Sequence, residues 1–189
     1  MILVGKLATL RPLTVADAET TLRWRQSVRA RFLQRGAQTV EEQKAWIISR
    51  EQAGDLNFII EYQNAPVGMI ALLDVNYRHK TAVMGRLLIG EPDFVGSAPV
   101  AFEADLLLCD NVFDHLKFHK IYGDIMEDNI AMIRTRAYLG YKQDGILRDH
   151  YIYNGVYKNT VVVSLLEDEY RKICRPKLVG LIDLFSRYR

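Results

Sequence analysis

The chain has 189 residues, 49% of them hydrophobic and 25% charged, and its formal charge is +2 from 25 basic and 23 acidic side chains. This is the composition of a globular domain that can bury a core without a disulfide or a structural metal. A charge so close to neutral gives no indication of nucleic-acid binding.

The sequence also bears on location and metal binding. The apolar residues 1–13 lack the basic region and the long apolar core of a signal peptide, and no stretch approaches the ~18 consecutive apolar residues of a membrane-spanning helix. Cys109 and Cys174 match no metal-ligand spacing and fit a reducing compartment. We therefore expect a cytoplasmic protein with no metal and no membrane partner.

The first third of the chain is predicted to form one strand and two helices. Residues 2–10 alternate weakly in hydrophobicity, as an edge strand does. Thr14 is suited to cap a helix that extends to about residue 27, because its hydroxyl can accept a backbone N–H. Thr39-Val40-Glu41-Glu42 has the capping-box pattern of a second helix that stops near Gly54.

A three-stranded antiparallel meander is predicted next, over residues 58–62, 67–75 and 82–89, with Asn64-Ala65-Pro66 forming the first turn. A loop over residues 90–98 follows it.

The second half alternates helices and strands. Its predicted elements are a helix over 100–116, a strand over 119–126, a helix from Asp128 to Leu139, strands over 147–153 and 156–166, and a helical tail over 167–189 broken at Pro176. Asn154-Gly155 favours a type I′ hairpin between the last two strands.

This order of elements predicts an α/β (α+β) fold, in which a central mixed, mostly antiparallel sheet is covered by helices on both faces. We expect one domain over residues 1–170, with a helical extension over 171–189 packed on it. The apolar segment 178–185 in this extension indicates a homodimer contact.

Several short motifs follow one another along the chain. They are Leu10-Arg11-Pro12-Leu13 with Asp17, Pro66-Val67-Gly68-Met69-Ile70, Asp128-Asn129-Ile130-Ala131-Met132-Ile133, Leu139-Gly140-Tyr141, Asp144-Gly145-Ile146-Leu147-Arg148, and the hairpin 153–160. In this order they resemble the GNAT superfamily of acetyltransferases over roughly residues 8–170. The resemblance is to the subgroup of bacterial ribosomal-protein alanine, spermidine and nucleotide-aminosugar acetyltransferases.

The resemblance implies acetyl-CoA as co-substrate. In such enzymes a strand, here residues 82–90, separates from its neighbour and the thioester lies in the gap, while the pyrophosphate lies on the following loop and helix N-terminus, here residues 96–102. The implied cofactor-binding residues are Leu88, Ile89, Gly90, Gly96, Ser97, Ala98, Val100, Ala101 and Asn129. The N–H of Leu88 or Ile89 is also the expected oxyanion donor.

The phosphate loop departs from the family pattern, because Pro99 stands where a glycine normally offers its N–H and proline has none. Three interpretations follow: pyrophosphate binding with fewer donors, which we rank first; a different acyl donor or geometry; or a degenerate site that binds no CoA.

The usual acid and base of the family are also absent. Val83 occupies a position where relatives often carry Glu, and Arg136 one where many carry Tyr. The predicted catalytic residues are therefore His79 and Asp74 as bases and Tyr138 as acid. Glu103 is a further candidate base; His79 and Asp74 have equally simple interpretations as turn residues.

The acceptor is predicted less directly. The basic run 23–35 indicates either a solvated helix face, which we prefer, or a patch for an anionic substrate. The second interpretation makes a nucleotide-linked aminosugar the first choice among small-molecule amines, ahead of a polyamine and a protein N-terminus. Tyr151, Tyr153 and Tyr157 favour cross-strand packing over a substrate or dimer surface. A non-catalytic GNAT-like binding module is the alternative to an enzyme.

Overall fold

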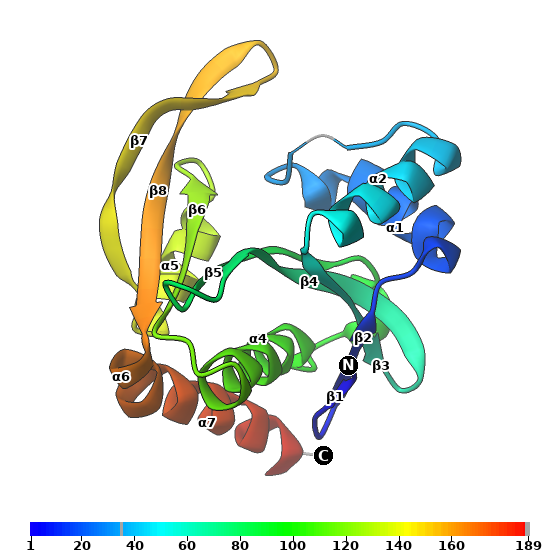
Figure 1. Ribbon diagram of the computed structural model, residues 1–189. Coiled ribbons are helices and arrows are strands. Elements are labelled where there is room, and N and C mark those ends of the chain that lie inside the picture. Colours follow the sequence, from blue (N-terminus) through cyan, green and yellow to red (C-terminus); the bar gives the residue numbers. More distant parts are fainter. Residues whose placement is uncertain (35, 188–189) are drawn as a thin grey trace.

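The computed structural model describes residues 1–34 and 36–187 (Figure 1). In this part of the chain one sheet has the strand order β1-β2-β3-β4-β5-β6-β8-β7. Its strands are β1 (Leu3–Val4), β2 (Ala8–Pro12), β3 (Leu56–Tyr62), β4 (Ala65–Asn76), β5 (Thr81–Ile89), β6 (Lys120–Met126), β7 (Lys142–Tyr153) and β8 (Val156–Leu166). Every adjacent pair is antiparallel except β5 and β6, which confirms the predicted mixed, mostly antiparallel sheet.

The helices cover both faces of this sheet, as predicted. They are α1 (Ala18–Gln26), α2 (Val40–Gln52), α3 (Pro92–Val95), α4 (Val100–Asp110), α5 (Ile130–Tyr138), α6 (Glu167–Glu169) and α7 (Arg175–Arg187). The helices α1 and α2 lie on one side of β4, and α4 and α7 on the other (Figure 1). None of the described helices is long and apolar enough to cross a membrane.

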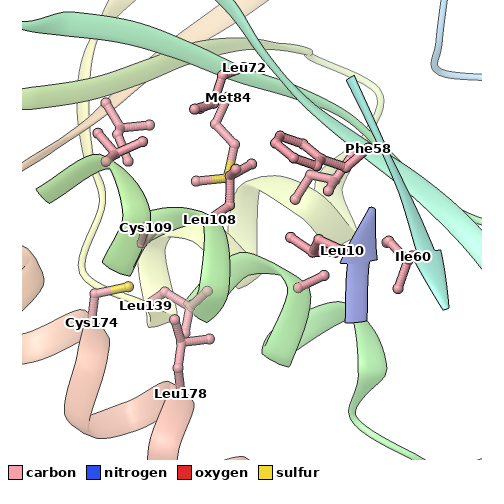
Figure 2. Close-up of a cluster of buried hydrophobic side chains, with 14 of the residues drawn as sticks. Leu10, Phe58, Ile60, Leu72, Met84, Leu108, Cys109, Leu139, Cys174 and Leu178 are labelled. Atoms are coloured by element: carbon pink, nitrogen blue, oxygen red, sulfur yellow. The ribbon is translucent and has the colours of Figure 1, made fainter. Parts of the chain in front are cut away.

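Two hydrophobic clusters hold the layers together. The larger joins the strands to α4 and α7, and Figure 2 shows Leu10, Ile60 and Leu72 of the sheet with Leu108 of α4 and Leu178 of α7. The smaller lies on the α1 side and contains Trp24, Ala30, Ile59, Met69 and Leu88. Neighbours such as Ile59 and Ile60 belong to opposite clusters because successive strand side chains point to opposite faces.

The N-terminal strand was predicted wrongly as one segment over residues 2–10. It is a hairpin of β1 and β2, and its turn is held by the buried carboxylate of Glu103 on α4. Glu103 accepts backbone N–H groups from Lys6, Leu7 and Ala8 at 2.8, 2.6 and 2.5 Å. This contact crosses almost a hundred positions of sequence, so alternation within residues 2–10 could not reveal it.

Three other boundaries differ from prediction. The loop over 90–98 contains the short helix α3, and β7 begins at Lys142 rather than at residue 147. The tail is not broken at Pro176: a π-helical turn over Tyr170–Cys174 leads directly into α7. A wider turn suits this place, because proline cannot donate to the carbonyl four residues earlier and its ring collides with it.

The turn between β7 and β8 has the predicted conformation. Asn154 and Gly155 have φ of 51° and 78°, and positive φ at both central positions defines type I′. At α5 the cap is Asn129 rather than Asp128, since the Asn129 side chain accepts the N–H of Met132 at 3.3 Å.

Candidate functional site

The parallel strands β5 and β6 separate along their length. Thr81, Ala82 and Val83 pair with Lys120, Ile121 and Tyr122, and the pairing stops there. Beyond this point the β4–β5 register jumps from Ala71↔Gly85 to Met69↔Leu88, so β5 carries a bulge. Bulges bend a strand, and this one contains Arg86 at a φ of 57°. The bend therefore opens a gap between β5 and β6.

A cavity of about 520 Å³ occupies this gap. One wall is formed by Arg25 of α1, Trp46 of α2 and Gln34 from the segment between these helices. The bulged part of β5 and strand β6 form two more walls. The last wall comes from α5 and its N-cap, through Asn129, Met132 and Arg136. Tyr151 of β7 completes one side. The cavity is thus lined from elements on both sides of the gap between the strands.

The α5 wall of the cavity carries a buried ion pair. Arg136 Nη1 lies 2.6 Å from Asp105 Oδ2 of α4, and the two side chains are only 9% and 3% exposed. Burial lowers the pKa of Arg136, but the Asp105 carboxylate outweighs it and the net shift is upward. The guanidinium also lies 5.0 Å from the ring centre of Tyr141. Arg136 is therefore a permanent positive charge at the cavity.

The same cavity is also lined by a carboxylate, that of Asp124. The Asp124 carboxylate of β6 and the side chain of Gln34 both lie next to the Tyr151 hydroxyl. Burial, followed by the Asp124 contact, raises the pKa of Tyr151 to about 12. Tyr151 therefore stays protonated well above neutral pH and can donate its hydroxyl proton to Asp124 beside it. Cross-strand packing alone, the interpretation preferred from sequence, does not describe Tyr151.

Two arginines flank one tryptophan at the same cavity. The guanidinium carbons of Arg25 and Arg86 lie 5.1 and 4.9 Å from the ring centre of Trp46. Arg86 donates to Asp55 Oδ2 at 2.9 Å and to Asn57 Oδ1 at 2.7 Å. The only carboxylate that either guanidinium contacts within the described residues is Asp55.

A second cavity, of about 550 Å³, lies against the expected phosphate loop. Gly96, Ser97, Ala98, Pro99, Ala101 and Phe102 line it with Arg29, Ile89 and the end of α7. The first i→i−4 bond of α4 runs from Glu103 N to Pro99 O, so the N–H groups of Ala101 and Phe102 precede the helical ladder. Arg29 donates from Nε to the backbone oxygen of Ile89, the last residue of β5, at 2.9 Å.

The structure distributes the predicted cofactor residues over both cavities. Asn129 lines the cavity in the strand gap, and Ile89, Gly96, Ser97, Ala98 and Ala101 line the second. Leu88 and Val100 are buried in the hydrophobic clusters, and Gly90 donates its N–H to Val67 O. Among the described residues, the part of β5 that faces the strand gap is Val83–Leu87 rather than Leu88 and Ile89.

The predicted catalytic residues lie outside the strand-gap cavity as the structure describes it. His79 is exposed in the turn after β4, where its backbone N–H donates to Asn76 Oδ1. Asp74 is exposed near the end of β4. Tyr138 is 53% exposed, and Lys177 Nζ lies 4.7 Å from its ring centre. The Glu103 carboxylate is already engaged by three backbone N–H groups of the turn between β1 and β2.

Asp124 and Arg25 were not singled out from the sequence. Asp124 interrupts the otherwise apolar strand 121–126, which was an available signal that this position has a polar partner. Arg25 had no such signal, because it stands in a run of arginines on a helix and only the tertiary structure distinguishes it from them.

Comparisons with known proteins agree with this architecture. The family described as "Acetyltransferase (GNAT) domain" matches residues 8–142. The chain is 26% identical over 113 residues to the spermidine N(1)-acetyltransferase of Escherichia coli K12, a match that covers 60% of this chain and 59% of that relative. It is 26% identical over 180 residues to the "Probable N-acetyltransferase YjcK" of Bacillus subtilis 168, covering 88% and 98%.

Solved structures show the same fold. A GCN5-related N-acetyltransferase from Brucella melitensis superposes with a TM-score of 0.81 at 21% identity, covering 95% of this chain and 84% of that one. The Vibrio cholerae spermidine N-acetyltransferase in complex with CoA and spermine gives a TM-score of 0.75 at 21% identity, covering 89% and 100%. Because the family match extends over most of the residues that build the sheet and the strand gap, the chain belongs to the GNAT acetyltransferase family.

Proposed function

We propose that this protein is an acetyl-CoA-dependent N-acetyltransferase that acts on the primary amine of a small molecule. The observation that carries the proposal is the cavity between β5 and β6, which has a carboxylate, Asp124, on one side and a fixed positive charge, Arg136, on another. Acetyl transfer from a thioester to an amine needs both: a group that takes a proton from the amine, and one that stabilises the departing thiolate.

Acetyl-CoA is the donor that GNAT acetyltransferases use, and the loop before α4 fits its pyrophosphate in part. The first-turn N–H groups of Ala101 and Phe102 are available, and a helix N-terminus favours phosphate. Pro99 supplies no donor, but Arg29 lines the same cavity and can contribute charge. Of the three interpretations drawn from the sequence, binding with fewer backbone donors is therefore the one we propose.

In the proposed reaction the acceptor arrives as an ammonium ion beside Asp124, which takes its proton. The nitrogen then attacks the thioester carbonyl, the C–N bond forms, the C–S bond breaks, and the nitrogen releases its second proton to solvent. Arg86 and Leu87 stand opposite the single β4 residue Ile70, so a bulge N–H is the proposed donor to the carbonyl oxygen in place of Leu88 or Ile89. Arg136 cannot release its proton near neutral pH, so we assign it to stabilising the thiolate, which solvent protonates.

The relatives reported above bear on the acceptor. Those with a named substrate act on spermidine, which supports a polyamine rather than the nucleotide-linked aminosugar placed first from the sequence. The basic run that favoured the sugar is divided in the structure: Arg23 pairs with Glu91, Arg29 lies at the phosphate loop, and Arg35 lies outside the described residues. Arg25 alone of the described members lines the strand-gap cavity.

Two measurements test the proposal. Calorimetry should detect acetyl-CoA binding, and a thiol-release assay with a panel of primary amines should detect turnover that Asp124→Asn strongly reduces. No heat of binding at millimolar acetyl-CoA would overturn the proposed donor. Binding without turnover of any amine would instead identify a non-catalytic binding module.

A further inference from the structure

Arg25 is a partly buried cation that has no acidic partner in the described part of the chain. Its Nη2 donates to the backbone oxygen of Gln34 at 2.8 Å, while its Nε is buried and has no hydrogen-bond acceptor. Across residues 1–34 and 36–187, no carboxylate lies within ion-pair distance of this guanidinium. Most buried donors in proteins are satisfied, so an unsatisfied charged donor at a cavity wall calls for an explanation.

The surroundings of Arg25 raise the free-energy cost of burying its charge. Arg86 lies over the same Trp46 ring, and the one carboxylate beside the two guanidinium groups, that of Asp55, pairs with Arg86. Burial and the charge of Arg86 both lower the pKa of Arg25. A contact with the indole ring is worth about 0.5–2 kcal/mol, which offsets only part of the cost of burying a cation without a counterion.

The chain is also shaped to admit this side chain. A Cβ atom at Gly36 would lie 2.9 Å from both Nε and Nη2 of Arg25, so any larger residue at that position would displace the guanidinium. Gly36 and Arg25 both line the strand-gap cavity. The absence of a side chain at position 36 therefore leaves room for the guanidinium beside the cavity.

The positive and negative sides of the cavity are connected. Gln34 accepts a hydrogen bond from Arg25 through its backbone oxygen, and its side chain and Asp124 both lie next to the Tyr151 hydroxyl. Resting on the proposed function, we propose that the acceptor carries an oxyanion, a carboxylate or a phosphate, in addition to its amine. Arg25 binds the oxyanion while Asp124 binds the amine. The planar guanidinium matches both kinds of oxyanion in a bidentate manner. The inferred acceptor therefore differs from the spermidine of the named relatives, since a polyamine would meet repulsion at Arg25.

Matched acceptor pairs test this inference. Lysine and cadaverine differ by one carboxylate, and glucosamine 6-phosphate and glucosamine differ by one phosphate, so the two pairs distinguish the sources of the anion. With acetyl-CoA and wild-type protein, the anionic member of at least one pair should have a kcat/KM about 10-fold or more above its partner. Arg25→Met should abolish that preference and leave the KM for acetyl-CoA unchanged. Arg31→Gln, at an exposed arginine stacked on Phe32, is the matched control.

Two outcomes would overturn the inference while leaving the proposed function intact. One is a wild-type preference for cadaverine, glucosamine or spermidine over the anionic amines. The other is a preference for anionic amines that survives in Arg25→Met. Absence of thiol release with every amine would count against the proposed function itself.

If no amine is acetylated, anion binding measured without turnover still tests the role of Arg25. With saturating CoA present, inorganic phosphate should raise the unfolding temperature of the wild type and of Arg31→Gln more than that of Arg25→Met. In buffer alone, Arg25→Met should unfold at a temperature no lower than the wild type, because it removes an uncompensated charge. Equal phosphate shifts, or an Arg25→Met protein less stable than the wild type, would assign Arg25 a structural role.

Discussion

The hydroxyl of Tyr151 on β7 lies next to the carboxylate of Asp124 on β6, although β8 lies between their strands in the sheet. The pair brings the long β7–β8 hairpin into contact with the strand gap, and Figure 1 shows this hairpin extending past the end of β6. It therefore positions the only carboxylate among the described residues that line the cavity.

If Asp124 takes the proton of the amine, Asp124→Asn should lower kcat/KM for the acceptor by about 10²–10⁴-fold, the usual contribution of a general base. The KM for acetyl-CoA should change little. Steady-state kinetics measure both. Asp168→Asn, in an exposed ion pair with Lys172, is the control for loss of a carboxylate. A fully active Asp124→Asn protein together with an inactive His79→Ala protein would restore His79 as the base.

Tyr151 should ionise at unusually high pH. Its pKa is raised to about 12 from an ordinary value of 10, because the neutral form is favoured by burial and by Asp124. A raised pKa means that its contribution to stability is complete below pH 10 and is lost as the pH rises from 10 to 12. Carbon-13 NMR of labelled tyrosine should show a signal that titrates near pH 12 and is missing in Tyr151→Phe. A wild-type Tyr151 signal titrating at pH 10 would contradict the assigned contact.

The Arg136–Asp105 pair should be sensitive to loss of one partner. Asp105→Asn leaves a buried guanidinium without its counterion and should lower the free energy of unfolding by about 3–5 kcal/mol, measured by urea denaturation. Replacing both residues by apolar ones of similar size, as in Asp105→Leu with Arg136→Met, should restore most of this loss. If our assignment of Arg136 to the thiolate holds, the double variant should nevertheless stay slow in acetyl transfer.

Glu103 should affect stability rather than chemistry. Glu103→Gln replaces a carboxylate that accepts three backbone N–H groups by an amide with one acceptor oxygen. We expect a loss of about 1.5–3 kcal/mol in unfolding free energy, the value of a charge-assisted hydrogen bond. The kcat of the folded protein should be unchanged. A large fall in kcat with normal stability would return Glu103 to the list of candidate bases.

Arg29 should affect the binding of acetyl-CoA, the acyl donor. Arg29→Ala removes the charge that lines the cavity of the phosphate loop and should raise the KM or Kd for acetyl-CoA several-fold, as for the loss of one charge-assisted contact, with kcat retained. Calorimetry with acetyl-CoA and with a CoA analogue that lacks the 3′-phosphate would locate the lost contact. Arg23→Ala, at an arginine paired with Glu91, is the control, and equal affinities of both variants would remove Arg29 from the site.

Much of the fold was predictable from local sequence patterns. The strands of the meander, the cap at Thr39 and the Asn154-Gly155 turn depend on residues that are neighbours along the chain, and each formed close to where it was predicted. At Thr14 the hydroxyl donates to Asp17 Oδ2 at 3.0 Å instead of accepting the predicted backbone N–H, and α1 begins only after a 3₁₀ turn. The ordered motifs also predicted the family. These features are local because propensity, capping and turn geometry act over only a few residues.

The site was decided by tertiary structure. Asp124 and Tyr151 meet across an intervening strand, Arg25 and Arg86 meet over Trp46, and Glu103 is occupied by a turn almost a hundred residues away. His79, Asp74 and Tyr138 have suitable chemistry, but folding places them outside the cavity. The sequence by itself determined the elements and the family, because both are encoded in short-range order. Which charges face one another across the strand gap was set only by packing, since a charge acts through distance in space and not through position in the chain.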